Sequence, residues 1–202
     1  HIGICTAHHF PSKHLGAYRT EITQVTNRIV KYFGISDGPI YFQMLIGAEG
    51  IKVNEVACRI GGAYEDELIP LLTGVDILDM VIASALGHDV DFAALEAYNF
   101  ERNNRTASVE MIFTRPGRIC SMTDIEEIKG LPGVRYAKYN FQPGRYVGEI
   151  VNATQRVGYM IIDGENRGTL GSNIERAYSN LKILDEAGSN MVMKFYNIRE
   201  RE

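Results

Sequence analysis

The sequence has no tryptophan and only three cysteines among its 202 residues. Cys5, Cys58 and Cys120 are odd in number and lack the spacing of metal ligands, which indicates reduced thiols in a cytoplasmic protein. The net charge is −4 and no basic run is present, so the electrostatic footprint of a nucleic-acid-binding protein is missing. The longest apolar stretch, residues 75–86, is interrupted by two aspartates and is too short to span a bilayer.

The chain also lacks an initiator methionine and the charged N-terminal region of a signal peptide. It opens on His1-Ile-Gly-Ile-Cys, a pattern that predicts a strand over residues 1–7. We therefore expect the chain to be a piece of a longer polypeptide. A hydrophobic content of 45% and a charged content of 23% are typical of a globular fold, and the length allows one large domain or two small ones.

Helical and strand patterns alternate along the chain without long repeats, which predicts an α+β fold. A polar segment over residues 98–106 is the best candidate for a domain boundary, so we expect domains at 1–97 and 98–202. Helices are expected at residues 18–33, 66–72, 76–86, 124–130 (with Thr123 as N-cap) and 172–184. Strands are expected at residues 1–7, 39–46, 51–57, 107–113, 117–122, 134–141, 155–164 and 191–196.

Three polar side chains interrupt the otherwise apolar hairpin at residues 39–57 and its continuation. Gln43 supplies an amide, Glu55 a carboxylate and Arg59 a guanidinium. Inside a buried sheet each of them would cost roughly 1–3 kcal/mol if left unsatisfied, so such groups are paired or bind something. The spacing suggests a metal–phosphate site.

The expected hairpin has a three-residue loop, Ala48 to Gly50, in which Gly50 takes the left-handed conformation. That loop places Gln43 opposite Glu55 and hence on the same face of the hairpin. It also pairs Leu45 with Val53 and leaves alternate apolar residues, such as Phe42 and Met44, on the core face. A two-residue or four-residue loop would shift the register by one and separate Gln43 from Glu55.

The segment that begins at Val53, VNEVACRIGGAYEDELIPLLTGVDILDMVIASALG, resembles the closing part of an ATP-grasp ligase catalytic domain. The form Glu-x-x-x-Arg-x-Gly-Gly followed by "IP…TGVDI" is most similar to the L-amino acid ligase branch. After residue 107, "LPGV", "QPG" and "RVGYMI" resemble the small C-terminal domain of that branch. The resemblance implies the C-terminal half of an ATP-grasp domain, an antiparallel sheet with helices, followed by a small α+β domain.

The resemblance also implies ATP and Mg²⁺ as cofactors, with Mn²⁺ able to replace Mg²⁺. Gln43 and Glu55 match the side chains that hold the metal between the phosphates of ATP. Leu45 matches the apolar residue under the adenine. Arg59 matches the catalytic residue that contacts the transferred phosphate or the acyl phosphate.

Gly61 and Gly62 match the tight backbone beside the substrate carboxylate. Two further residues are candidates for substrate contacts: His8, in the loop before the first helix, for substrate or phosphate, and Tyr64 for the wall of the amine pocket. The residues alone leave simpler interpretations open. Arg59 and Glu55 could form a structural ion pair, and His8 could be a solvated side chain in the loop of residues 8–12.

These matches predict a fragment of an ATP-dependent carboxylate–amine ligase that forms an amide or peptide bond through an acyl phosphate. Two alternatives remain: a carbamoyl-phosphate-synthetase-like ATP-grasp enzyme, and a non-catalytic nucleotide-binding module with a decayed metal site. Ala57 favours decay, because relatives such as biotin carboxylases have Asn at that position. The family's phosphate-gripping lysines and glycine-rich lid lie before this chain. The expected partner is therefore the N-terminal portion of the same polypeptide, the fragment alone should be inactive, and a homodimer stays open.

Overall fold

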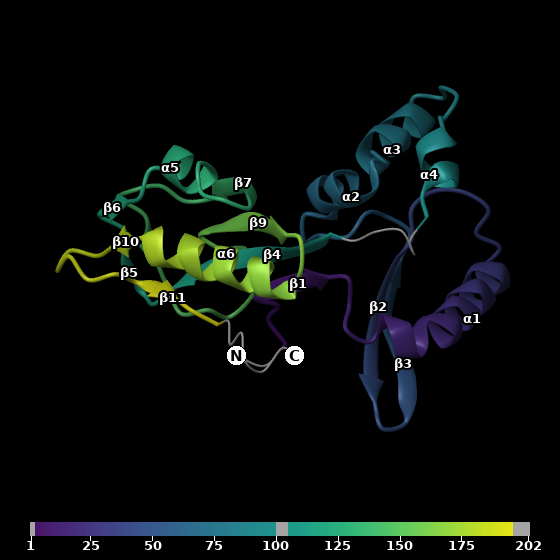
Figure 1. The fold of residues 1–202 in the computed structure, drawn as a ribbon, viewed down its shortest axis with the longest axis horizontal. Coiled ribbons are helices and arrows are strands. Elements are labelled where there is room, and N and C mark those ends of the chain that lie inside the picture. The colour runs from purple at the N-terminus through teal and green to yellow at the C-terminus, as the bar shows by residue number, and fades with distance from the viewer. Residues whose placement is uncertain (1–2, 100–104, 196–202) are drawn as a thin grey trace. The chain divides into compact units, whose positions relative to one another are not determined.

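The computed structural model describes residues 3–99 and 105–195 (Figure 1). The chain divides into two compact units. Unit 1 comprises residues 1–10 together with 104–202, and unit 2 comprises residues 11–103. This division differs from the expected domains at the N-terminus, because the first strand belongs to unit 1. Most of the polar segment that suggested a boundary, residues 100–104, lies outside the described residues.

Unit 1 is built on an antiparallel sheet with the strand order β1-β4-β9-β7, and β11 also pairs with β4. The expected mixed fold of antiparallel sheets and helices is confirmed, although this larger sheet lies mainly in residues 106–193 and not in the half expected to carry it. Its strands are β1 (Ala7–Phe10), β4 (Thr106–Thr114), β7 (Val134–Tyr139), β9 (Gly158–Gly164) and β11 (Val192–Met193). Two small two-stranded sheets join β5 (Gly117–Arg118) to β8 (Tyr146–Val147) and β6 (Ser121–Met122) to β10 (Ile183–Leu184).

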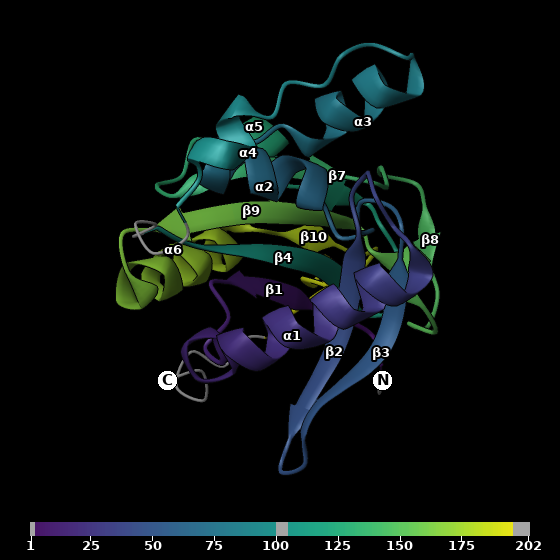
Figure 2. The same cartoon turned by 90° about the vertical axis from the view of Figure 1, so that its right-hand side faces the viewer.

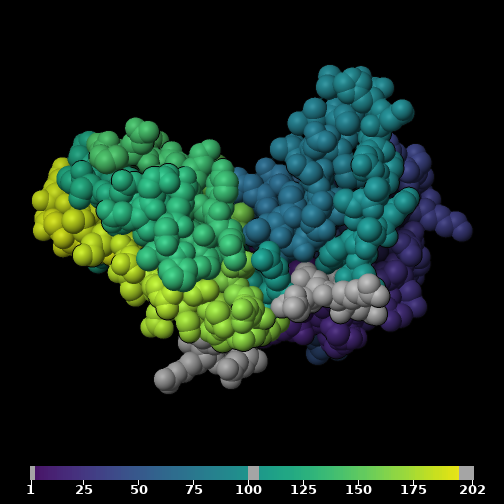
Figure 3. All heavy atoms as spheres, turned by 45° about the horizontal axis from the view of Figure 1, so that its top comes forward, coloured from purple at the N-terminus to yellow at the C-terminus, as the bar shows by residue number. Residues whose placement is uncertain are grey.

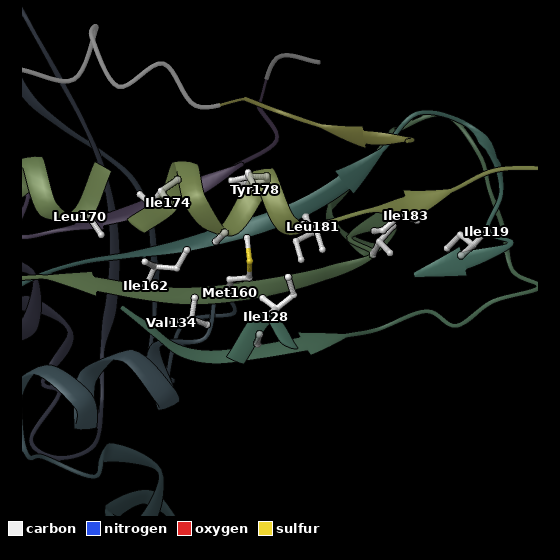
Figure 4. Packing of buried hydrophobic residues seen from close by; sticks show 14 of the residues in the cluster. Ile119, Ile128, Val134, Met160, Ile162, Leu170, Ile174, Tyr178, Leu181 and Ile183 are labelled. Atoms are coloured by element: carbon white, nitrogen blue, oxygen red, sulfur yellow. The ribbon is translucent and has the colours of Figure 1, made fainter. Parts of the chain in front are cut away.

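The core of unit 1 forms where helix α6 (Arg167–Asn180) covers the sheet. Strands β4 and β9 are buried along nearly their whole length, and the buried residues include the polar side chains of Ser108, Glu110 and Asp163. Met160 and Ile162 of β9 lie in one cluster with Ile174 and Tyr178 of α6 (Figure 4). In the space-filling view the atoms of unit 1, green to yellow, pack into one continuous body (Figure 3).

Several expected boundaries in unit 1 are wrong in detail. The first strand begins at Ala7 rather than ending there, the expected strand at 117–122 is two short strands, and residues 153–155 form a 3₁₀ helix, η2 (Ala153–Gln155). Helix α5 (Ile125–Lys129) is capped by Asp124, whose side chain accepts from the Glu126 amide, and not by Thr123.

Unit 2 contains four helices among its described residues. They are α1 (Leu15–Phe33), α2 (Glu65–Thr73), α3 (Ile77–Ala85) and α4 (Ala93–Ala97), and the hairpin of β2 (Tyr41–Gly47) and β3 (Gly50–Ala57) lies between α1 and α2 in sequence. α1 ends at Gly34, which adopts the left-handed conformation that glycine tolerates (φ 64°). No single described helix is long and apolar enough to cross a membrane; α2 and α3 meet that test only as a pair, which is bent by 115°.

Unit 2 has few buried side chains of its own. Among its described hydrophobic residues, only Leu68 and Val75 are buried. Helix α1 lies beside the hairpin (Figure 2), and the Glu21 carboxylate accepts from the Ile51 amide at 3.4 Å, yet α1 has no buried residue. Large hydrophobic side chains stay exposed in this unit, namely Tyr32, Phe33, Leu45, Val53, Leu78, Ile82, Leu86, Phe92 and Leu95.

We expect Ile162→Ala to lower the free energy of unfolding of unit 1 by about 2–5 kcal/mol, because it opens a cavity in a fully buried site. Urea denaturation followed by circular dichroism measures the change. Val151→Ala is the control, since Val151 is exposed and its truncation should cost no more than about 0.5 kcal/mol. Equal effects of the two substitutions would contradict this placement of the core.

Burial, with a smaller contribution from Asp124, raises the pKa of Tyr139 to about 12, and its hydroxyl donates to the Thr123 carbonyl at 3.0 Å. In the unfolded chain the pKa of tyrosine is about 10. The unfolded state therefore loses its proton first, and stability should fall as the pH rises from about 10 towards about 12.

The Tyr139→Phe variant should be about 1 kcal/mol less stable than the unchanged chain near neutral pH, because it lacks the hydrogen bond. Near about pH 11 the difference should be smaller, because only the unchanged chain loses stability when the tyrosine of its unfolded state ionises. Urea denaturation at both pH values tests this, with Tyr32→Phe as an exposed control. A stability difference that does not change with pH would count against a buried, neutral Tyr139 hydroxyl.

Candidate functional site

The hairpin brings Gln43 and Glu55 directly opposite each other, as the sequence predicted. The route differs from the expected one. The connection has two residues, because Gly47 pairs with Gly50, and Leu45 faces Lys52 rather than Val53. Gly50 does take the expected left-handed conformation (φ 83°).

A β-bulge restores the pairing that a two-residue connection would otherwise have broken. From Gly47 to Met44 the partners follow one register, and between Met44 and Gln43 the register shifts so that Asn54 is the extra residue. The Asn54 side-chain amide donates to the side-chain oxygen Oε1 of Gln43 at 3.0 Å. Asn54 is the residue that sequence reasoning missed, and a polar side chain next to Glu55 was its only signal.

The face that carries Gln43 and Glu55 is open to solvent rather than buried. Gln43, Leu45 and Glu55 are exposed, whereas Phe42, Met44 and Ile46 on the other side of β2 are half-buried. The face of β2 predicted to be the core is therefore the less exposed one, but its residues are half-buried and not part of the core. The argument that these polar groups sit inside a buried sheet is wrong, because β2 and β3 form a two-stranded sheet of their own.

Arg59 lies two residues beyond the end of β3 and turns back toward the hairpin. Its Nη2 is 3.7 Å from the Glu55 Oε1, and its Nη1 donates to the Ile60 carbonyl at 2.8 Å. Both charged side chains are about half exposed, so the ion pair contributes about 0–1 kcal/mol. The structure thus brings Gln43, Glu55 and Arg59 together around one exposed surface.

The turn from Gly61 to Tyr64 leads into α2 and is conformationally strained. Tyr64 is the N-cap of α2 and the one non-glycine residue with a positive φ (68°) among the described parts of the chain. A left-handed conformation of this kind costs about 1–3 kcal/mol and persists where surrounding contacts enforce it. Here the Glu65 carboxylate accepts from the Ala63 amide at 2.6 Å.

His8 is not in a loop, as the sequence suggested, but in strand β1, where it pairs with Val109. Its Nε2 is 3.3 Å from the Cys5 thiol. His8 belongs to unit 1, whereas Gln43, Glu55, Arg59, Gly61, Gly62 and Tyr64 belong to unit 2. The structure therefore groups the hairpin and turn residues and does not group His8 with them.

The donor set of the hairpin fits a magnesium ion that keeps much of its water. In the described ranges no three or more His, Cys, Asp or Glu side chains gather in a way that could hold a metal. Protein ligands would thus be the Glu55 carboxylate and an amide oxygen of Gln43 or Asn54. Mg²⁺ commonly binds proteins through one or two carboxylates and fills its other positions with water and substrate phosphates.

Comparison of the sequence with known proteins finds a family model and a curated relative that match this chain. Residues 111–184 match the family described as L-amino acid ligase C-terminal domain 2. The chain is 24% identical over 173 residues to the uncharacterized protein y4rH of Sinorhizobium fredii, covering 85% of this chain and 35% of that protein. It therefore spans about a third of the length of this curated relative.

Solved structures share the fold at low identity. The L-amino acid ligase of Bacillus licheniformis is similar with a TM-score of 0.74 and 19% identity, over 90% of this chain and 44% of that one. The phosphoribosylglycinamide synthetase of Anaerococcus prevotii has a TM-score of 0.75 and 13% identity, and the match covers 91% of this chain and 46% of that one.

A third neighbour is the biotin carboxylase domain of the Hydrogenobacter thermophilus 2-oxoglutarate carboxylase, solved with MgADP and bicarbonate. It has a TM-score of 0.64 and 16% identity, and the match covers 93% of this chain and 40% of that one. All three neighbours extend well beyond the region that this chain matches. The chain accordingly has the fold of the C-terminal part of the ATP-grasp superfamily of ligases, as the sequence resemblance predicted.

Proposed function

We propose that this chain is the C-terminal part of an ATP-dependent carboxylate–amine ligase that forms an amide or peptide bond. The observation that carries the proposal is the cross-strand pair of Gln43 and Glu55 with Arg59 beside it. The match of residues 111–184 to an L-amino acid ligase domain favours an amino acid as the carboxylate substrate.

In this proposal each hairpin residue has a separate task. Transfer of a phosphoryl group to a carboxylate brings two anions together, so charge neutralisation and positioning dominate catalysis. Glu55 and Gln43 would hold Mg²⁺, which shields the phosphates of ATP when it is bound. Leu45, 61% exposed, would offer an apolar surface to the adenine.

Arg59 would contact the transferred phosphoryl group. A guanidinium presents five N–H donors in a planar fork that matches a phosphate or carboxylate. In the described structure one of its nitrogens is bonded to the Ile60 carbonyl and another faces Glu55 at 3.7 Å, so the Glu55 contact can be exchanged for a ligand at little cost. The Gly61–Gly62 backbone would lie beside the substrate carboxylate, and Tyr64 would line the amine pocket.

The whole enzyme would require the N-terminal portion of the same polypeptide. Unit 2 leaves much apolar surface uncovered, and the chain spans only 44–46% of the two ligases with the higher TM-scores. We infer that the missing portion supplies the remaining half of the nucleotide site and covers part of unit 2.

We expect Glu55→Ala, made in the polypeptide that contains this chain, to lower the rate of turnover at limiting Mg²⁺ by about 100-fold or more. Even substitutions of the residues that merely support metal ligands cost about 10–100-fold in metal affinity or activity. ATP-dependent phosphate release at varied Mg²⁺ concentration measures the effect. Glu49→Ala is the matched control, since Glu49 is an exposed hairpin carboxylate that pairs with Lys52. Unchanged turnover of Glu55→Ala would exclude the metal-binding role assigned to Glu55.

The 202-residue chain by itself should form no ligation product. The expected reason is that half of the ATP site, including the lysines that grip the phosphates, lies outside it. Incubation with ATP, Mg²⁺ and mixtures of amino acids, followed by mass spectrometry, checks this. ATP-dependent product from the chain alone would contradict the division of the site between two halves of a polypeptide.

A further inference from the structure

The turn between β3 and α2 is closed by an acidic side chain that belongs to α2 itself. The Glu65 carboxylate accepts a short hydrogen bond, 2.6 Å, from the Ala63 amide. Hydrogen bonds to an ionised acceptor are roughly twice as strong as neutral ones. Glu65 therefore holds the backbone two residues before it in place.

The same carboxylate packs against Gly61. A Cβ atom at Gly61 would overlap with both carboxylate oxygens of Glu65, whereas a Cβ atom at Gly62 would meet nothing within 4 Å. Gly61 does not have the positive φ that requires glycine at other turns of this chain. A side chain at position 61 would therefore displace the Glu65 carboxylate, the flexible end of its side chain, from its place beside the turn.

This contact lies next to the atom that orients Arg59. The Arg59 Nη1 donates to the carbonyl of Ile60, which immediately precedes Gly61. A chain of contacts thus runs from the Glu65 carboxylate, through the Gly61–Ala63 backbone, to the Ile60 carbonyl and the guanidinium.

We propose that Glu65 is a positioning residue that fixes the direction of the Arg59 guanidinium by clamping the Gly61–Ala63 turn. The proposal rests on the proposed function in that Arg59 is taken as the residue that meets the transferred phosphate. Glu65 acts through the turn and contacts neither phosphate nor metal.

Helix capping alone does not account for this arrangement. Glu65, Asp66 and Glu67 all lie in the first turn of α2, where any negative charge is favoured by the helix dipole. Glu65 differs from Asp66 because its carboxylate contacts Gly61 and Ala63. The two explanations also differ in sign. A negative charge near an anion site weakens anion binding by repulsion, so removing Glu65 should strengthen binding unless Glu65 positions the cation.

Three variants of this chain separate these effects. Glu65→Ala removes both the charge and the hydrogen-bond acceptor, Glu65→Gln removes the charge and keeps an acceptor, and Asp66→Asn removes a charge from the same helical turn without touching Gly61 or Ala63. Nuclear magnetic resonance of the ¹⁵N-labelled chain then reads the exchange of the Ala63 amide with solvent and the order of the Arg59 Nε–H group.

In Glu65→Ala the Ala63 amide should exchange about tenfold faster, the loss expected for one hydrogen bond, and the Arg59 Nε–H should become disordered. In Asp66→Asn both signals should stay close to those of the unchanged chain. In Glu65→Gln, which keeps a weaker neutral acceptor, both changes should be smaller than in Glu65→Ala. An Arg59 signal that is unaffected in Glu65→Ala, or equally affected in Asp66→Asn, would overturn the proposal.

Titration with inorganic phosphate, followed at the Arg59 Nε–H, tests the proposed function separately. We expect Glu65→Ala to weaken phosphate binding by about tenfold, and tighter binding in this variant would overturn the positioning role. If phosphate does not perturb Arg59 even in the unchanged chain, the assignment of Arg59 to phosphate fails, while the ordering of Arg59 by Glu65 is still decided by the exchange data.

A substitution at Gly61 keeps the test informative if Glu65→Ala unfolds α2. Gly61→Ala should lower the melting temperature, because the new methyl group displaces the Glu65 carboxylate from its hydrogen bond with the Ala63 amide. The double variant Gly61→Ala with Glu65→Ala should lose less stability than the two single variants lose in sum, because the methyl group then has no carboxylate to displace. Strict additivity of the two changes would contradict the clamp.

Discussion

The bulge at Asn54 is the constraint on which the proposed site depends. With Gly47 opposite Gly50, a regular hairpin would place Gln43 opposite Asn54 and turn the Glu55 side chain to the other face. One extra residue in β3 moves Glu55 back to the side of Gln43 and leaves Asn54 free to hold the Gln43 amide. Bulges are common where a side chain must be re-aimed, and this one aims a carboxylate.

The hairpin and the turn that follows it use small contacts to position charged groups that remain open to solvent. Glu55 and Arg59 form a loose pair, and Arg59 is held by a backbone carbonyl rather than by a buried partner. An exposed guanidinium held in this way can exchange one anion for another. The strained backbone at Tyr64 and the glycine at position 61 indicate that the turn is built for a defined geometry rather than for stability.

The two units differ in how completely they bury their apolar residues. Unit 1 has a sheet covered by α6 and a cluster of buried side chains from both. Unit 2 has long amphipathic elements, such as α1, that no described residue of the chain fully covers. Exposed apolar faces of this extent are typical of surfaces that meet another part of a protein, which agrees with the fraction of its relatives that this chain spans.

The sequence by itself determined most of the element types, the mixed fold of helices and antiparallel strands and the less exposed face of β2, because side-chain periodicity and the signals of glycine, proline and capping residues are local. The sequence predicted the pairing of Gln43 with Glu55 from a three-residue loop, whereas the structure reaches it through a two-residue connection and a bulge. It also located Arg59 beside that pair through its spacing. Only the tertiary structure decided the two-residue connection, the bulge at Asn54, the place of His8 in the sheet of unit 1 and the contact of Glu65 with Gly61. Each of these depends on which strand edge or backbone group lies close to the side chain after folding. The periodicity of the sequence does not predict such contacts.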